Sequence, residues 1–167
     1  MTKSPRLLLT ALCGVLFLPA ALPVPATASV VLQREFRYEA ARFHLAGLPD
    51  GTTRVAMRGA ARDDTPGQAD LPLVGERVEL PLGLRLAEVR LVGIETARLA
   101  GGVRVPSTER PRQDLDGFDR TEPDPAVFGS AGFVPAVPVR IGSQGFERGR
   151  NVAYVVVAPV RWAPSTG

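Results

Sequence analysis

Few residues in this chain could act as a nucleophile or as a general base. His44 is the only histidine and Cys13 the only cysteine of the 167 residues. A histidine base needs a nucleophile beside it, and Cys13 lies in a segment that we expect to be removed. The turns Gly129-Ser130-Ala131-Gly132 and Gly142-Ser143-Gln144-Gly145 lack the Gly-x-Ser-x-Gly spacing of a nucleophile elbow. We therefore predict a structural or surface role for His44, and no catalytic residue and no enzymatic activity in this chain.

An acidic cluster offers the only candidate for a metal site. Asp114, Asp116 and Asp119 surround Gly117, and carboxylates on a flexible loop are suitable ligands for calcium. The spacing differs from that of the EF-hand, in which glycine follows the third acidic position. We therefore predict a solvated acidic loop without a bound metal, and the sequence predicts no cofactor.

Residues 1–28 have the layout of a secretory signal peptide. Lys3 and Arg6 precede an apolar run from Leu7 to Leu18, and the segment ends in Ala26-Thr27-Ala28. The apolar run is short for a membrane span, and prolines follow it, which argues against an uncleaved anchor helix. We expect cleavage between Ala28 and Ser29, and a secreted or periplasmic location.

Removal of the signal peptide changes the charge and the redox chemistry. Lys3, Arg6 and Cys13 leave with it, so that 18 of the 20 basic residues remain beside 17 acidic ones. The remaining basic residues are arginines interspersed with acids, which does not indicate a nucleic-acid or membrane surface. Without a cysteine, residues 29–167 can form no disulfide. We expect neither nucleic acid nor a membrane as a partner.

The rest of the chain has the apolar pattern of strands and no sustained helical period. Charged and apolar residues alternate in residues 35–39, 54–58 and 87–91. Residues 152–162 are apolar on both faces, which is typical of a central strand, and Pro159 predicts a bulge or a strand end. Because a central strand needs a neighbour on each edge, a turn at residues 163–167 is expected to lead into a further strand.

Glycine and proline turns separate these runs, for example at Pro49-Asp50-Gly51 and Thr65-Pro66-Gly67. Short strands at this spacing predict an all-β fold, namely an antiparallel, jelly-roll-like β-sandwich, with a single curled sheet or barrel as the alternative. Residues 103–135 are rich in proline and predict a long irregular loop, which in a compact domain is often functional.

Four phrases in order carry a resemblance to a known family. They are Pro66-Gly67-Gln68-Ala69-Asp70-Leu71-Pro72, Leu80-Pro81-Leu82-Gly83, Asp124-Pro125-Ala126-Val127-Phe128, and Phe146-Glu147-Arg148-Gly149-Arg150-Asn151-Val152-Ala153, which leads into residues 157–167. From about Thr65 onward the chain resembles the propeptides of gingipain-type cysteine peptidases.

The resemblance implies a non-catalytic, all-β propeptide domain over residues 29–167. Such a domain precedes a caspase-like catalytic domain, assists its folding and blocks its active site until cleaved. The partner implied is thus a cognate caspase-like peptidase, in cis or in trans. In the family the propeptide continues past the position of Gly167, so residues 29–167 are expected to lack one or more C-terminal strands.

The resemblance also gives the long loop a possible function. Inhibitory propeptides place a loop in the substrate cleft, and some gingipains prefer arginine. Arg110, Arg112 and Arg120 all lie on this loop, so one of them is a candidate for the peptidase's specificity pocket, where a charge-assisted contact would hold it.

A stand-alone secreted β-sandwich that binds carbohydrate or a cell-surface partner is the alternative, because sandwich folds have many functions. The reading frame downstream of Gly167 separates the two hypotheses, since a caspase-like domain there would indicate the propeptide.

Overall fold

The computed structural model describes residues 29–111 and 118–164. The chain divides into two compact units, residues 1–35 and residues 36–167. The expected signal peptide lies outside the described residues, and the described part of the first unit, residues 29–35, contains no helix or strand. None of the described helices has the length and apolar character needed to cross a membrane.

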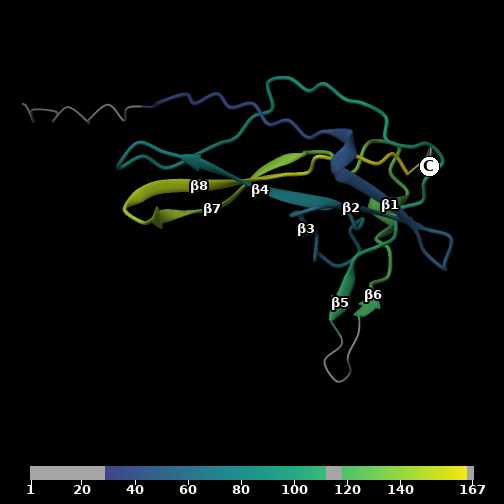
Figure 1. Ribbon diagram of the computed structural model, residues 1–167. Helices are drawn as coiled ribbons and strands as arrows, with labels where there is room; N and C mark the ends of the chain where they lie inside the picture. The colour runs from purple at the N-terminus through teal and green to yellow at the C-terminus, as the bar shows by residue number, and fades with distance from the viewer. Residues whose placement is uncertain (1–28, 112–117, 165–167) are drawn as a thin grey trace, which may run out of the picture. The chain divides into compact units, whose positions relative to one another are not determined.

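Antiparallel strands make up nearly all of the regular secondary structure in the described part of the second unit (Figure 1). This confirms the predicted all-β, antiparallel fold. The strands are β1 (Phe43–Gly47), β2 (Thr53–Met57), β3 (Ala61–Arg62), β4 (Pro72–Glu79), β5 (Glu109–Pro111), β6 (Phe118–Arg120), β7 (Val139–Glu147) and β8 (Arg150–Val157), with a 3₁₀ turn, η1 (Ala40–Arg42), and one short helix, α1 (Pro125–Phe128).

Strand β8 is the central strand of the largest sheet, as its sequence predicts. The sheet has the order β3-β4-β8-β7, and Val157 of β8 lies opposite Val74 of β4 and Val139 of β7. The strand ends two residues before Pro159, as expected. Both neighbours of β8 precede it in the chain, so its edges need no strand from beyond Gly167. A further strand after Gly167 stays a prediction, and it would pair elsewhere.

Two of the predicted strands are wrong, although their apolar alternation has a physical cause. Residues 35–39 and 87–91 are neither helix nor strand. Phe36, Tyr38 and Val89 nevertheless pack against Val78, Val155 and Val157, which are buried residues of β4 and β8. Each of these segments therefore buries one apolar face without pairing with a neighbouring strand. The predicted β-sandwich and its jelly-roll topology stay a prediction.

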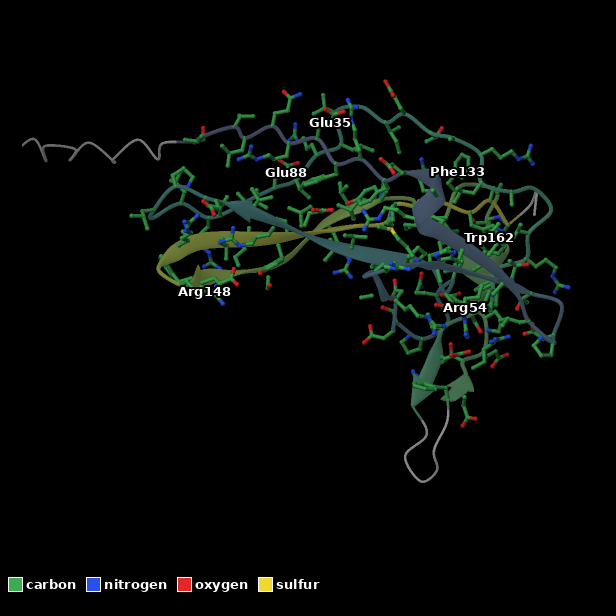
Figure 2. The ribbon with its side chains drawn as sticks, viewed as in Figure 1. Glu35, Arg54, Glu88, Phe133, Arg148 and Trp162 are labelled. Carbon is green, nitrogen blue, oxygen red and sulfur yellow. The ribbon has the colours of Figure 1, made fainter. Side chains whose placement is uncertain are left out.

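A second apolar cluster surrounds the start of β4. Its buried members are Val55, Ala69, Leu71, Val105 and Val160. Trp162, labelled in Figure 2, packs against this cluster and meets the ring of Phe128 edge-on at 5.4 Å. The indole Nε1–H donates to the carbonyl oxygen of Val103 at 2.8 Å. This tryptophan thus joins the end of the described chain to the start of the proline-rich segment.

The segment over residues 103–135 is more regular than its sequence predicts. Within it, β5 and β6 pair as a short antiparallel hairpin, with Arg110 opposite Asp119. Helix α1 follows, and the carboxylate of Asp124 caps it by accepting a hydrogen bond from the amide of Ala126 at 2.9 Å. The sequence did not predict these elements, because each is only three or four residues long and lies among prolines.

Tyr38, which packs against the cluster of Val78, Val155 and Val157, also makes a polar contact with Glu76 of β4. Its hydroxyl donates to Glu76 Oε1 at 2.8 Å. Burial, together with the hydrogen bond to Glu76 and its negative charge, raises the pKa of Tyr38 above the ordinary value of about 10. The folded state favours the neutral phenol, so this contribution to stability is complete below about pH 10 and is lost at higher pH.

We expect Tyr38→Phe to lower the free energy of unfolding by about 1 kcal/mol, the usual value of such a hydrogen bond. Denaturant melts at pH 7 measure this loss. In Tyr154→Phe, Tyr38 is the only tyrosine of residues 29–167, and its ultraviolet titration should begin only above the range of a free tyrosine. A titration midpoint near pH 10 in that variant would contradict the assignment.

Candidate functional site

The β5–β6 hairpin begins next to the most deeply buried of the described residues. Pro106, Ser107 and Thr108, directly before β5, are all less than 2% exposed or at that limit. The amide of Asp70 donates to the Pro106 carbonyl at 2.9 Å, and the amide of Thr108 donates to the Gln68 carbonyl at 2.9 Å. The strand that enters the hairpin is therefore fixed to the segment before β4.

Hydroxyl groups close the base of the hairpin. Thr108 precedes β5 and Thr121 follows β6, and the Thr121 amide donates to the Thr108 carbonyl at 2.8 Å. The Thr121 hydroxyl lies 2.9 Å from the same carbonyl, and the Thr108 hydroxyl donates to the Thr65 carbonyl at 2.8 Å. Ser107 donates to the Thr121 carbonyl. These buried bonds tie both ends of the hairpin to one another and to the body of the fold.

Two of the phrases that carry the family resemblance meet at this base. Gly67 has φ +78°, and a Cβ on it would lie 3.1 Å from Asp124 Cβ and 3.3 Å from the carbonyl oxygen of Glu122. The Asp124 amide also donates to the Gly67 carbonyl at 3.0 Å. Glycine is thus needed here both for its backbone conformation and for the close approach. The Pro-Gly phrase, which precedes the hairpin in the chain, and the Asp-Pro phrase, which follows it, therefore form one structural unit at its base.

A buried carboxylate anchors the charged side of the same base. Asp70 is 1% exposed. Arg62 of β3 binds it with two guanidinium nitrogens, and the Nε–Oδ1 distance is 2.7 Å. The Nε of Arg54, on β2, lies 3.5 Å from Asp70 Oδ2. The hydrogen bond to Asp70 raises the pKa of Arg62. Figure 2 shows Arg54 close to the point where the hairpin begins.

Glu109 extends this cluster into the hairpin. Arg54 donates to its carboxylate, and nitrogens of Arg62 and Arg120 lie 3.5 and 3.6 Å from it. Arg120 also donates to Asp50, in the turn between β1 and β2. We call these six residues, Asp50, Arg54, Arg62, Asp70, Glu109 and Arg120, the anchor network. It links the first and last residues of the hairpin to β2, β3 and the buried Asp70.

The structure gives the three candidate arginines different surroundings. Arg120 is held by the anchor network, with its side chain 31% exposed. Arg110 is exposed, and its side chain has no hydrogen bond or ion pair among the described residues. Arg112 lies outside the described residues. Phe118, which faces Pro111 across the hairpin, is 66% exposed. Arg110 and Phe118 are therefore available to a partner, whereas Arg120 is already occupied.

The candidate calcium loop stays a prediction of no binding. Asp114 and Asp116 lie outside the described residues, and Asp119 is an exposed residue of β6. We expect isothermal calorimetry with residues 29–167 to detect no calcium binding tighter than micromolar, because the spacing matches no strong calcium motif. Sub-micromolar binding that Asp116→Ala abolishes, and that Asp64→Ala retains, would contradict this expectation.

His44 lies on β1 opposite Ala56 and is exposed. The sequence did not reveal Asp70 as a site residue, although a carboxylate between Ala69 and Leu71 at the start of a strand is a signal of a buried charge. Nor did it reveal the partners of Asp70, because Arg62 and Arg54 lie on two separate strands whose pairing the sequence does not predict.

No family model and no curated protein matches this sequence. Among solved structures, a similar chain occurs in the complex of the pro- and mature domains of RgpB from Porphyromonas gingivalis, with 15% identity and a TM-score of 0.55. The match covers 74% of this chain and 65% of that chain. This similarity confirms the expected resemblance at the level of the fold, and this chain spans about two thirds of the RgpB chain.

A second solved structure concerns the zymogenic latency of gingipain K from Porphyromonas gingivalis. It is also 15% identical, over 74% of this chain and 71% of that chain. Its TM-score of 0.48 is too low for a shared fold to be argued from it.

Proposed function

We propose that this chain is the propeptide domain of a gingipain-type cysteine peptidase, which binds the catalytic domain, assists its folding and blocks its active site until it is cleaved. The observation that carries the proposal is the fold shared with a chain from the complex of RgpB pro- and mature domains. In this proposal residues 1–28 direct export, cleavage follows Ala28, and the domain acts outside the cytoplasm.

The β5–β6 hairpin is the element that we assign to the active-site cleft. Inhibition by a loop requires that the loop keep its shape before binding, because ordering it on binding would reduce the affinity. The hydroxyl bonds of Thr108 and Thr121 and the anchor network fix both ends of this hairpin. A rigid base with exposed side chains near the tip fits such an inhibitor.

Arg110 and Arg112 are the side chains that we assign to the specificity pocket. A guanidinium fits an acidic pocket through paired, charge-assisted hydrogen bonds, which strengthen when water is excluded. Arg120 was the third candidate, and its contacts with Asp50 and Glu109 support a positioning function instead. Its release would leave the half-buried carboxylate of Glu109 with fewer partners.

The test uses the gingipain-type catalytic domain from the organism that produces this chain. Residues 29–167 are titrated against that domain, and hydrolysis of a fluorogenic peptide with arginine before the cleaved bond is followed. We expect saturable inhibition that approaches one propeptide per enzyme. Trypsin serves as the control enzyme, because it reads the same arginine side chain and any inhibition of it would reflect substrate competition alone.

Absence of inhibition, or the absence of any gingipain-type gene in that organism, would contradict the proposal and favour a stand-alone binding module. The assistance to folding has its own measurement. The yield of soluble, active catalytic domain should rise when residues 29–167 are co-expressed with it, and an unchanged yield would remove that part of the proposal.

A further inference from the structure

Strand β7 forms one edge of the largest sheet and has a single neighbour. The sheet ends at β7 in the order β3-β4-β8-β7, and Figure 1 shows the strand beside β8. Apart from the ladder with β8, no backbone–backbone hydrogen bond between described residues involves the main chain of residues 139–147. The main-chain groups on the outer side of β7 are therefore available to another strand.

This edge lacks most of the features that protect a sheet from pairing with another chain. Protected edges are short, carry lysine or proline, or are covered by other segments. The opposite edge, β3, is only two residues long, and its Arg62 is bound to Asp70. Strand β7 is nine residues long and contains neither lysine nor proline. A long open edge of this kind is suited to the addition of a strand.

A bulge in the middle of β7 brings two opposite charges to one face of the strand. Arg140 lies opposite Val156 of β8, and Glu147 lies opposite Arg150. Residues an even number apart on one strand share a face, and so do residues that lie opposite each other on neighbouring strands. Arg140 and Glu147 therefore lie on the same face, near the two ends of β7, although they are an odd number of residues apart.

Two apolar residues lie together on the other face of β7. Ile141 and Phe146 lie opposite Val155 and Asn151, which share a face of β8. Phe146 is 72% exposed. In chain order, β7 thus carries a positive and then an apolar residue near its start, and an apolar and then a negative residue at its end.

We propose that β7 pairs antiparallel with β7 of a second copy of this chain, which joins the two large sheets into one across a two-fold axis. In a pairing centred on Gln144, Arg140 faces Glu147 of the second copy on one face, and Ile141 faces Phe146 of the second copy on the other. The two-fold axis repeats each contact at the opposite end of the strand. The edge is thus complementary to itself in charge and in apolar character, which favours a second copy over an unrelated strand.

Both charged side chains are able to make the contact. Arg140 is exposed, and its side chain has no hydrogen bond or ion pair among the described residues. Glu147 Oε2 accepts from the Nε of Arg77 at 2.9 Å and from the Tyr154 hydroxyl at 3.3 Å. Its Oε1 accepts no hydrogen bond from a described residue, and the side chain is 45% exposed. A guanidinium of the second copy can therefore bind Oε1 while Arg77 stays in place.

The dimer does not depend on the proposed function, because the β5–β6 hairpin belongs to another sheet. One added strand buries a small surface, so the association is expected to be weak and reversible. Main-chain hydrogen bonds supply the affinity of such a pairing, and the side chains set its register.

Sedimentation velocity of residues 29–167 at concentrations up to about 1 mM, a range suited to a small interface, tests the dimer. We expect the mass to rise from that of a monomer to that of a dimer. Arg140→Glu and Glu147→Arg should each weaken the dimer at least tenfold, because each places like charges opposite one another at both ends. An equimolar mixture of the two variants should regain it, since their charges are complementary at both ends. Arg148→Glu, a charge reversal in the adjacent turn, is the control and should leave the dimer unchanged.

A monomer throughout this range would overturn the inference, and this is the result expected if the edge accepts a strand of a different protein. A dimer that neither charge reversal weakens, or a mixture that stays monomeric, would overturn it as well.

Disulfide formation checks the register without a change of charge. Cys13 is the only cysteine of the chain, so Ile141→Cys and Phe146→Cys each place a single thiol in residues 29–167. A disulfide requires Cα atoms within about 7 Å of each other. We expect an oxidised mixture of the two variants to give a linked heterodimer, and neither variant alone to become linked. No linked product in the mixture, or equal linkage in the single variants, would contradict the proposed pairing.

Discussion

Replacement of Asp70 by asparagine should lower the free energy of unfolding by about 2 to 3 kcal/mol. The carboxylate is 1% exposed and lies against the guanidinium groups of Arg62 and Arg54. Loss of one partner of a fully buried ion pair costs about 3–5 kcal/mol, because an uncompensated charge remains. The arginine side chains here are 43% and 28% exposed, so water relieves part of that cost.

Urea melts of residues 29–167 at neutral pH measure this loss. Asp64→Asn is the matched control, since Asp64 is exposed and six residues away in sequence, and it should change stability by less than about 0.5 kcal/mol. If the two variants have equal stability, the anchor network does not hold the base of the hairpin. A double variant with Arg62→Ala should cost less than the sum of the single variants, because they share one interaction.

Loss of the pocket-binding arginine should have the largest effect on inhibition. We expect either Arg110→Ala or Arg112→Ala to weaken inhibition of the gingipain-type catalytic domain at least 30-fold. Removal of one partner of a buried, hydrogen-bonded charge pair across an interface costs about 2–5 kcal/mol, and 1.4 kcal/mol corresponds to a factor of ten. Because Arg110 is exposed and has no ion pair among the described residues, Arg110→Ala should leave the stability of the free domain unchanged.

Arg148→Ala and Arg120→Ala are the two controls for this measurement. Arg148 is exposed at the turn between β7 and β8, as Figure 2 shows, and its loss should not alter inhibition. Arg120→Ala should lower stability, because it removes contacts with Asp50 and Glu109. Inhibition that survives both Arg110→Ala and Arg112→Ala would show that no arginine near the hairpin tip enters the specificity pocket.

The success of the strand predictions depended on what buries each face. Residues 152–162 are apolar on both faces, and β8 is indeed the centre of its sheet. Residues 54–58 alternate, and β2 covers most of them. The same alternation in residues 35–39 and 87–91 did not give strands, because Tyr38 and Val89 bury one apolar face without a ladder neighbour. An alternating apolar pattern thus indicates that one face of a segment is buried, but it does not indicate that the segment pairs with a neighbouring strand.

The segment that carries the candidate site was predictable from the sequence, but the contacts that hold the site in position were not. The sequence predicts a functional loop in the proline-rich segment, and the hairpin that we propose as the inhibitory element lies within it. Its anchors were not predictable, because Asp70 contacts residues from two other strands and Arg120 is 70 residues from Asp50. Arg120 therefore looked like a free arginine, whereas the fold uses its charge to position the hairpin.

Site-directed cross-linking tests most directly the claim that this hairpin enters the active-site cleft. Cys13 is the only cysteine, so residues 29–167 contain no thiol. Arg110→Cys, Arg112→Cys and Phe118→Cys each place one thiol on the hairpin, where a disulfide requires Cα atoms within about 7 Å of each other. Phe133→Cys and Glu88→Cys are controls at exposed positions outside the hairpin.

We expect at least one hairpin variant to form a disulfide with the catalytic cysteine of the gingipain-type domain, and neither control to do so. Prior alkylation of the catalytic cysteine should abolish the product. Inhibition by the unmodified chain together with no cross-link at any hairpin position, or with equal cross-linking at the controls, would show that the peptidase is blocked by another surface.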